Sequence, residues 1–391
     1  MANTLTNLLP DIYAALEVVS REMVGFIPNC TRNAGVESAA QGETVRWPVA
    51  PTVASGTTLT PSMTIPALND VTIPNRTITL NTAKYVPVSF NGEEQKGLGN
   101  AGIYNNIVQQ SFEQGFRVLI NEMETAIGTA AVLGASRGHG TAGTAPFASD
   151  LTGFGAMKEI LDYNGAPVAN RKLVIDGKAG YNLAKLTQLT NVNQAGSNDL
   201  LRNGQFGRVL GFDVSESAGV KLHTAGTQTL SDTVGINAVG TTTIAYDGGD
   251  GGTQLAGDLL EFTGDTTGPG GTTNKYVLTR ALTAAAGDWI IAKPGLVRVS
   301  AAHDEGVIIG ASSTWRANMA FTPDFLVLGC RPPARPVDGD AALDAKVVTD
   351  PNTGISFLVA SYGGFMAHLY TISILWGVAT GNPAHGAILL G

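Results

Sequence analysis

Charge is the scarcest property of this 391-residue sequence. Only 14% of its residues are charged, against about 25% in a typical soluble domain. A surface with so few charged groups is often covered by another protein, and self-association is the simplest way to cover it. The net charge of −8 gives no global basic footprint for nucleic acid, and it argues against a binder of anionic membranes.

Cysteine is rare as well, since Cys30 and Cys330 are the only two. A pair so far apart in sequence is not a disulfide framework and is typical of a reducing compartment. We expect two ordinary buried thiols. The N-terminal residues show no basic region followed by an apolar run, so we expect no signal peptide. The most apolar region, residues 357–378, is interrupted by glycines and polar residues, which predicts strands and not a membrane span.

Motifs for catalysis and metal binding are also missing. None of the serine-hydrolase, phosphate-loop or zinc-protease motifs occurs, and the histidines lack metal-ligand spacing. Asp247, Asp250 and Asp258 fit neither an EF-hand nor a glycine-rich calcium repeat. Residues 303–305, His-Asp-Glu, would alternate between the two faces of a strand. We therefore expect no enzyme activity, no cofactor and no metal site.

One glycine-rich stretch does match a functional fingerprint. Residues 138–143 read Gly-His-Gly-Thr-Ala-Gly, and Asp162 lies about 20 residues on, as in dinucleotide-binding motifs. That motif needs a strand before it and a helix that starts at once, because the helix N-terminus holds the pyrophosphate. Here a long helical pattern leads in, and the next helical pattern starts several residues later. We expect the match to be accidental.

The strongest positive pattern is a helix predicted over residues 100–134. Apolar residues recur there at spacings of three and four, which places them on one face, and polar residues, Glu124 among them, fill the other face. At about 1.5 Å per residue the helix would be about 50 Å long, so other elements should pack along it. Gly115 and Gly128 lie inside it, although each costs about 1 kcal/mol in helix propensity. A glycine inside a packed helix often marks a close crossing.

The chain before this helix predicts a terminal helix over residues 5–24. Its apolar residues have helical spacing, and Asp11, Glu17 and Glu22 lie on its polar side. A lone terminal helix needs a surface to pack on, either its own core or that of a neighbour.

Two strands are predicted next, over residues 44–49 and 76–90. Residues 50–75 between them are rich in Pro, Thr and Ser. A stretch of this length is long for a loop in a compact domain. It is either disordered or an extended arm that packs on another subunit.

Shorter elements follow the long helix. A second helix is predicted from a Ser149 cap to Asn164-Gly165. A strand over 172–176, a helix over 179–189 and a tight hairpin over 205–214 come after it.

Residues 225–299 have a different character from the rest. Thr, Gly and Asp dominate, and turn clusters separate short runs of strand-forming residues. This pattern predicts an all-β module inserted into the surrounding domain. The predicted strands of the module span 242–246, 259–263, 276–280, 289–292 and 296–299. Further strands are predicted over 325–329, 354–361 and 367–378.

Four stretches together resemble one protein family. The sequence is similar to the major capsid (coat) proteins of tailed phages that share the HK-97-type fold, and among them to the P-22-like coat proteins. The order and spacing of the stretches carry the resemblance, which spans nearly the whole chain. They are Glu43-Thr44-Val45-Arg46-Trp47-Pro48-Val49, Ala179-Gly180-Tyr181-Asn182-Leu183-Ala184-Lys185, Gly204-Gln205-Phe206-Gly207-Arg208-Val209-Leu210-Gly211-Phe212-Asp213-Val214, and Ile374-Leu375-Trp376-Gly377-Val378 followed by Asn382-Pro383.

The resemblance implies an α+β, HK-97-like capsid fold with an inserted all-β domain. The long helix would be the spine helix of a peripheral domain, and an extended E-loop would lie over the neighbouring subunit. The implied divisions are an N-terminal arm over 1–35, the E-loop and flanking strands over 36–90, the peripheral domain with its spine helix over 91–144, the axial domain over 145–224 and 301–365, the inserted β-domain over 225–300, and C-terminal strands of the peripheral domain over 366–391.

The implied function is structural. Pentamers and hexamers of the chain would form the icosahedral shell that encloses a double-stranded DNA genome, without sequence-specific binding to it. The implied partners are a portal protein, a scaffolding protein and, as an option, a decoration protein. The implied location is the virion, after synthesis in the cytoplasm of the bacterial host.

Three further interpretations belong with this one. Asp11, Glu17 and Glu22 are candidate contacts to a basic scaffolding protein, against the alternative that the terminal helix packs within the shell. Gly115 and Gly128 are candidate bending points of the spine helix during shell expansion. The rival functions are an encapsulin-like compartment shell, which shares the fold, and a β-rich tail or receptor-binding protein, which the long helix disfavours.

Overall fold

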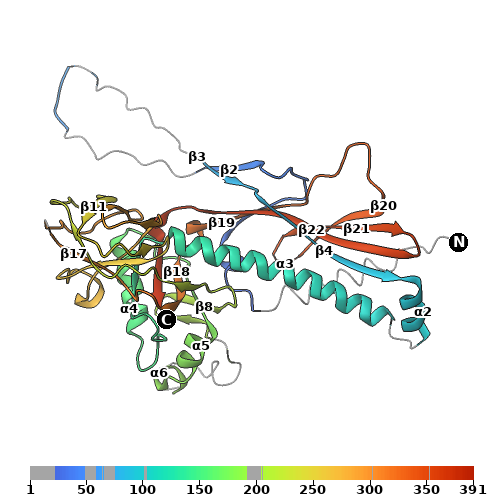
Figure 1. Cartoon of the computed structure of the whole chain (residues 1–391), viewed down its shortest axis with the longest axis horizontal. Coiled ribbons are helices and arrows are strands. Elements are labelled where there is room, and N and C mark those ends of the chain that lie inside the picture. The colour runs from blue at the N-terminus through green and yellow to red at the C-terminus, as the bar shows by residue number, and fades with distance from the viewer. Residues whose placement is uncertain are drawn as a thin grey trace.

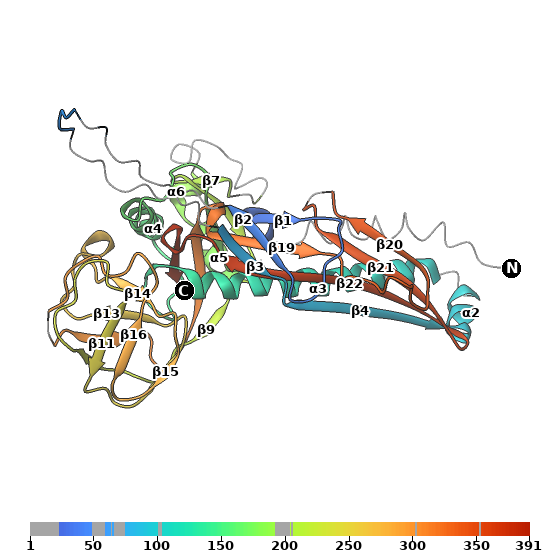
Figure 2. The ribbon, with the colours of Figure 1, turned by 90° about the horizontal axis from the view of Figure 1, so that it is seen from above.

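The molecule is elongated, with one long helix running along it (Figures 1 and 2). The computed structural model describes residues 23–48, 59–63, 65, 75–100, 104–191, 204, 206–301, 303–351 and 353–391. A β-rich module lies at one end of the long helix and a short helix, α2 (Gly92–Asn100), at the other. No helix among the described residues is long and apolar enough to cross a membrane.

The long helix is α3 (Tyr104–Gly134). Its length follows from the apolar periodicity, and at about 1.5 Å per residue it spans about 46 Å. The predicted start at residue 100 is wrong, because Asn100 is the last residue of α2.

A sheet of six strands, counted within the described residues, packs along α3. Its central strand is β22 (Ala367–Thr380). Phe112 of α3 meets Tyr370 edge-on at 5.5 Å, and Phe116 meets Phe357 at 5.2 Å between ring centroids. These aromatic contacts fix the helix against the sheet. The other strands are β1 (Thr31–Ala34), β4 (Thr82–Asn91), β19 (Leu326–Arg331), β20 (Ala342–Thr349) and β21 (Ser356–Gly364).

A second group of strands runs from the end of α3 to a small helical layer. α4 (Thr152–Tyr163) and α5 (Gly177–Ala184) share a buried apolar cluster with these strands, in which Phe154 and Phe212 face each other at 6.1 Å. α6 (Thr187–Thr190) follows α5. The strands in spatial order are β5 (Arg137–His139), β23 (Gly386–Leu390), β18 (Thr314–Phe321), β6 (Arg171–Ile175), β8 (Phe212–Glu216) and β7 (Arg208–Val209).

The β-rich module closes on itself. Its strands follow the order β16, β11, β10, β17, β13 and β14, and a bridge between Leu278 and Ile291 joins the two ends of that order. The resulting barrel has its own core, in which Tyr246 stacks on Trp289 at 4.6 Å. Its strands are β10 (Ser231–Thr233), β11 (Thr243–Asp247), β13 (Leu259–Phe262), β14 (Lys275–Val277), β16 (Gly287–Ile290) and β17 (Glu305–Ile308), with the small pair β12 (Thr253–Gln254) and β15 (Leu282–Thr283) beside it.

The predicted strand over residues 76–90 is in fact two strands. β3 (Asn75–Thr79) pairs with β2 (Thr44–Pro48) as a separate ribbon, and β4 pairs with β22. Leu80 between them is fully buried, and its backbone N–H donates to Glu43 O at 2.9 Å. The strand is interrupted at the buried Leu80, where its partner changes from β2 to β22. The local sequence pattern does not indicate this change.

Three smaller predictions also need correction. The predicted helix over 179–189 begins at Gly177, capped by the Asp176 side chain, and ends at Ala184. Ser149 does not cap α4, because the carboxylate of Asp150 accepts the N–H of Thr152 at 2.9 Å. Residues 296–299 form no strand.

The domain divisions of the sequence remain predictions. One of them, at residue 365, falls between β21 and β22, which are paired neighbours in one sheet. The predicted unit 366–391 also contains both β22 of that sheet and β23 of the other. The chain leaves the first sheet and re-enters the second within this short C-terminal stretch.

Candidate assembly site

Asp250 and Asp258, which the sequence analysis considered as calcium ligands, make separate hydrogen bonds. Asp258 is buried and lies 2.7 Å from His223 Nε2. Asp250 accepts the N–H and the hydroxyl of Thr229 in a turn. Within the part of the chain that the structure describes, no group of three or more acidic, histidine or cysteine side chains could hold a metal ion.

The glycine-rich fingerprint is built differently from a nucleotide site. A short strand, β5, does lead in, which the sequence did not predict. The next helix, however, begins only at Thr152, so no helix N-terminus lies beside the glycines to hold a pyrophosphate. Asp162 forms an ion pair with the buried Arg171 at 2.7 Å. Asp162 therefore has a structural partner.

The most distinctive buried group on α3 is the carboxylate of Glu124, which is 2% exposed. One oxygen accepts the backbone N–H groups of Gly25 at 2.7 Å and Phe26 at 2.6 Å, and the other accepts that of Ile27 at 3.0 Å. The hydroxyl of Ser217 adds a fourth donor at 2.6 Å. No ion pair to Glu124 occurs among the described residues, so hydrogen bonds alone compensate its burial.

Close backbone packing surrounds this carboxylate. A Cβ atom on Gly128, one turn along α3, would lie 2.2 Å from Gly219 O and 3.4 Å from Phe26. A Cβ atom on Gly219 would lie 2.6 Å from Glu124 Cγ. The glycines therefore let α3, the N-terminal segment and the segment before the barrel meet at one place, which we call the Glu124 junction: residues 25–27, Glu124, Gly128 and 217–219.

Burial sets the ionisation of the groups at this junction. It raises the pKa of Glu124, while the four hydrogen bonds act in the opposite direction. Burial, followed by the nearby charge of Glu124, raises the pKa of Cys30 to about 12. Burial also raises the pKa of Cys330. Both cysteines are free and buried, so the prediction of two ordinary buried thiols is confirmed, and at neutral pH they stay unreactive thiols.

The sequence prediction for Glu124 is wrong, because it placed this residue on the polar face of the helix. Glu124 follows Ile120 by four residues and precedes Ile127 by three, and both isoleucines are buried. Those spacings place Glu124 in the apolar stripe. A charged residue inside an apolar stripe was the signal that could have identified it.

Two buried polar clusters join the barrel to the rest of the molecule. His223 of β9 (Leu222–Thr224) packs against Trp315, its register partner in β18, with 4.9 Å between the ring centroids. Its Nε2 atom also contacts Asp258 of the barrel. On the other side, the buried Arg137 donates to Asn164 Oδ1 at 2.8 Å and to Asn274 Oδ1 at 3.1 Å. Burial lowers the pKa of Arg137.

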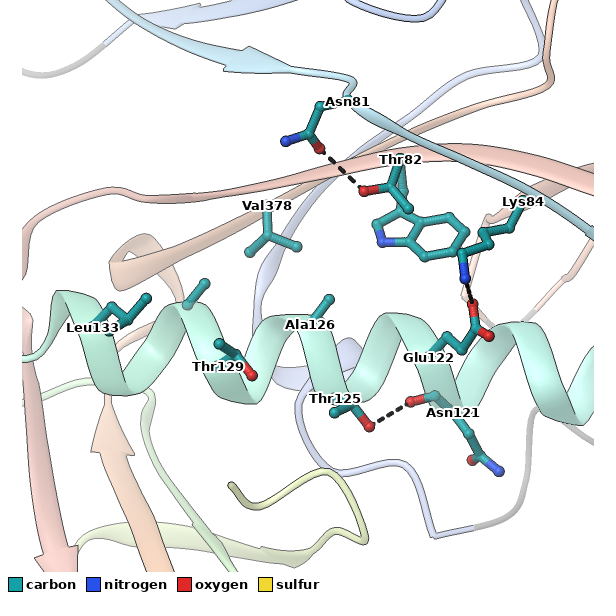
Figure 3. A pocket seen from close by; sticks show the side chains of 12 residues that line it. Asn81, Thr82, Lys84, Asn121, Glu122, Thr125, Ala126, Thr129, Leu133 and Val378 are labelled. Carbon is teal, nitrogen blue, oxygen red and sulfur yellow. Dashed lines mark hydrogen bonds and ion pairs between the residues drawn. The ribbon is translucent and has the colours of Figure 1, made fainter. Parts of the chain in front are cut away.

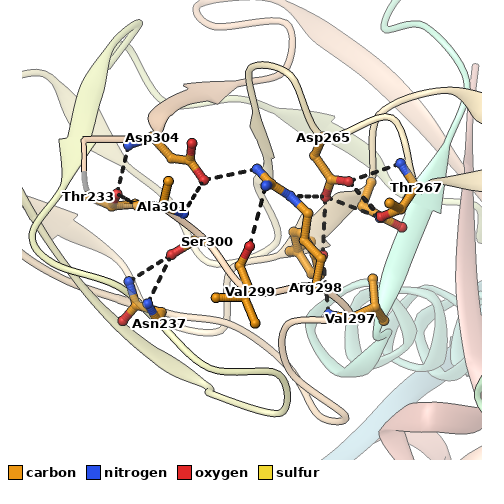
Figure 4. Close-up of polar contacts among 12 residues, drawn as sticks. Thr233, Asn237, Asp265, Thr267, Val297, Arg298, Val299, Ser300, Ala301 and Asp304 are labelled. Atoms are coloured by element: carbon orange, nitrogen blue, oxygen red, sulfur yellow. Dashed lines mark hydrogen bonds and ion pairs between the residues drawn. The ribbon is translucent and has the colours of Figure 1, made fainter.

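Asn274 continues this network into the barrel, where Arg298 points toward Asp265 (Figure 4). Asn274 Nδ2 donates to the buried carboxylate of Asp265. Arg298 bridges Asp265, at 3.3 Å, and Asp304, at 2.9 Å. Asp304 is one of the three adjacent residues 303–305, and its partner is a structural arginine.

An open groove of about 680 Å³ follows one side of α3, between that helix and strands β4 and β22 (Figure 3). An exposed ion pair between Lys84 and Glu122, at 3.4 Å, crosses it. The other lining residues are Asn81, Thr82, Asn121, Thr125, Ala126, Thr129, Ala130, Leu133, Trp376 and Val378.

Large apolar side chains are exposed at the extremities of the molecule. Leu59, Met63 and Ile65, in the segment that connects β2 to β3, are 94%, 104% and 89% exposed. At the far end, Phe365 in the β21–β22 turn is 95% exposed. On the barrel, Ile236 is 75% exposed. Apolar groups held so far from any core are typical of surfaces that another protein covers.

The predicted site residues fall on different parts of the chain. Asp11, Glu17 and Glu22, with most of the predicted terminal helix, lie outside the described residues, as does most of the predicted arm. Gly115 lies on the buried face of α3, where an added Cβ would meet the Cδ1 of Ile372 at 2.8 Å. Gly128 lies in the Glu124 junction. Bending at either glycine remains a prediction.

Comparison with known proteins gives likenesses of structure only. No protein-family model and no curated protein matches this chain. The capsid of the cyanophage P-SCSP1u is 12% identical with a TM-score of 0.45, over 91% of this chain and 85% of that one. A chain of the mature capsid of bacteriophage PhiM1 is 14% identical with a TM-score of 0.44, over 93% and 86%. A chain of Mycobacterium phage Che8 is 11% identical with a TM-score of 0.44, over 90% and 88%. TM-scores below 0.5 do not establish a shared fold, and these likenesses establish nothing about function.

Proposed function

We propose that this chain is a structural shell protein, the major capsid protein of a tailed phage with an HK-97-like fold. Many copies assemble into an icosahedral shell around double-stranded DNA. The observation that carries the proposal is the set of fully exposed apolar side chains at separate extremities of an elongated, weakly charged molecule. Such side chains are unfavourable in water, and contacts between copies would bury them.

The resemblance seen in the sequence supports the same conclusion. Its stretches coincide with β2, with α5, with the hairpin of β7 and β8, and with the end of β22. The long helix beside a sheet and the barrel within residues 225–308 fit the spine helix and the inserted domain that the resemblance implies. A portal, a scaffolding protein and a decoration protein are proposed partners on the same basis.

Replacing Leu59, Met63 and Ile65 together by serine tests the proposal. We expect the wild-type chain to form shells tens of nanometres across in negative-stain electron microscopy, and the triple variant to stay as folded subunits. The reason is that the substitutions remove apolar area worth several kcal/mol per contact, at about 25 cal/mol per Å², while touching no core.

The matched control keeps the three positions apolar, as Leu59→Ile, Met63→Leu and Ile65→Leu, and should still form shells. Monomers of the wild-type chain at high concentration would contradict the proposed function. Shells formed equally well by the serine variant would contradict the role of these three side chains.

An encapsulin-like compartment shell is the second candidate. It would share the assembly contacts and differ in its content, which would be a cargo enzyme and not DNA. The closed barrel, which has a buried apolar cluster of its own, favours the phage alternative, as the inserted module did in the sequence. Nuclease-protected DNA in purified particles would support the phage shell, and a co-purifying enzyme would support the compartment.

Docking of a scaffolding protein on the N-terminal residues is a further part of the proposal. Lysine at Asp11, Glu17 and Glu22 should lower the amount of scaffolding protein incorporated during co-expression, because like charges would then face its basic residues. Gel densitometry of purified particles measures this. Unchanged incorporation would favour the alternative, in which the terminal segment packs within the shell.

A further inference from the structure

The Glu124 junction brings together three parts of the chain that are distant in sequence. Gly25, Phe26 and Ile27 lie 97 to 99 residues before Glu124, and Ser217 lies 93 residues after it. All these contacts end on one carboxylate. Removing it would leave three backbone N–H groups and a hydroxyl without an acceptor in a buried place, which costs free energy at each group.

The junction continues into the barrel through a short, fully connected path. The hydroxyl of Ser217 also accepts the N–H of Gly219 at 2.9 Å. Lys221, two residues later, directly precedes β9. His223 of β9 contacts Asp258 of the barrel. Val220 O accepts a hydrogen bond from Arg316 at 3.0 Å, and Ala317 N–H donates to Lys221 O. Residues 220 and 221 are therefore hydrogen-bonded to β18.

A second contact links the N-terminal segment to Ser215, which lies just before residues 217–219 of the junction. Asn29 Nδ2 donates to Ser215 Oγ at 3.0 Å and to Gly25 O at 2.7 Å. This contact is only partly buried, whereas the four hydrogen bonds of Glu124 are buried. Phe26 itself is buried and lies on Phe321 at 6.1 Å, which fixes the position of the segment relative to β18.

We propose that Glu124 couples the N-terminal segment, residues 23–31, to residues 215–224, which lead into the barrel, so that loosening either segment loosens the other. The carboxylate is the shared acceptor, and Gly128 and Gly219 hold the three backbones too close for one to shift alone. Coupling of this kind is reciprocal, because it is a free energy shared by two sites. A partner that binds the N-terminal residues would thereby change how firmly the barrel is held. This inference rests on contacts within one chain and does not depend on the proposed function.

Hydrogen exchange measured by mass spectrometry on the full-length chain tests the coupling. In Glu124→Gln we expect the amides of residues 23–31 and of 215–224 to exchange at least tenfold faster, both together, because the amide group cannot accept at both positions. The matched control is Glu122→Gln, two residues away on the same helix with an exposed partner. It should change either segment less than twofold.

Ser217→Ala keeps the proposal testable if the first variant fails to fold. It removes one hydroxyl from the barrel side, and we expect a smaller, roughly threefold acceleration at residues 25–27 as well as at 215–224. Acceleration confined to 215–224 in this variant would overturn the coupling. So would a folded Glu124→Gln variant in which residues 23–31 loosen while 215–224 stay protected, because the two segments would then open independently of each other.

Discussion

Alanine at Gly128 is expected to destabilise the folded subunit by about 2–3 kcal/mol, although alanine is the better helix former. The added Cβ would lie 2.2 Å from the backbone carbonyl oxygen of Gly219, and a backbone cannot rotate away as a side chain can. Overpacking of this kind costs more than the helix propensity that alanine gains, about 1 kcal/mol. Urea unfolding of the unassembled subunit, followed by circular dichroism, measures the change.

Gly115 provides the matched control within the same helix. There the nearest atom to an added Cβ is the Cδ1 of Ile372 at 2.8 Å, followed by Val86 at 3.5 Å. The end of a flexible side chain can move, so we expect Gly115→Ala to change stability by less than about 1 kcal/mol. Equal effects of the two substitutions would show that close backbone contact is not what distinguishes them. Shells of Gly115→Ala that expand normally would count against Gly115 as a bending point.

Replacing Asp258 by alanine is expected to cost about 3–5 kcal/mol, the largest effect among the polar residues of the barrel. Asp258 is fully buried, and it accepts hydrogen bonds from the backbone N–H of Leu255 at 2.7 Å and of Gly226 at 3.1 Å, beside its contact to His223. Alanine would leave all three without an acceptor at the place where the barrel joins β9. Differential scanning calorimetry should show a lowered Tm for Asp258→Ala.

Asp250 offers a control from the same barrel with a similar number of hydrogen bonds. It accepts from Thr229 and from the N–H of Gly252, but it is exposed, so water replaces the lost contacts. We expect Asp250→Ala to cost less than about 1 kcal/mol. A loss of stability for Asp258→Ala no larger than that of the control would show that burial of the network contributes little.

Several elements of the fold could be predicted because their signals are local. The periodicity of residues 104–134 specified a helix whatever packs on it. Turn clusters and strand-forming runs located a β-rich module at residues 225–299, and a tight pair of glycines marked the hairpin of β7 and β8. The separation of Cys30 and Cys330 in sequence, together with the usual burial of free cysteine, predicted buried thiols.

Two of the errors share one cause, which is that partners distant in sequence decided the outcome. Residues 76–90 have strand propensity throughout, but Leu80 is where the chain leaves β2 and joins β22 as its partner. β18 and β23 were not predicted, although both are central in their sheet. Their burial comes from neighbours on both sides, and a short apolar run does not reveal how many neighbours it will have.

The sequence by itself determined that this chain has a long helix, a β-rich module and few charged residues. These properties depend on composition and on spacing along the chain. The tertiary structure alone decided which groups donate to the buried carboxylate of Glu124, because its four donors come from residues more than 90 positions away. It also decided why Gly128 is a glycine. The N-terminal segment and residues 217–219 both pack against the turn of α3 that contains Gly128, so a side chain at that position would clash with them.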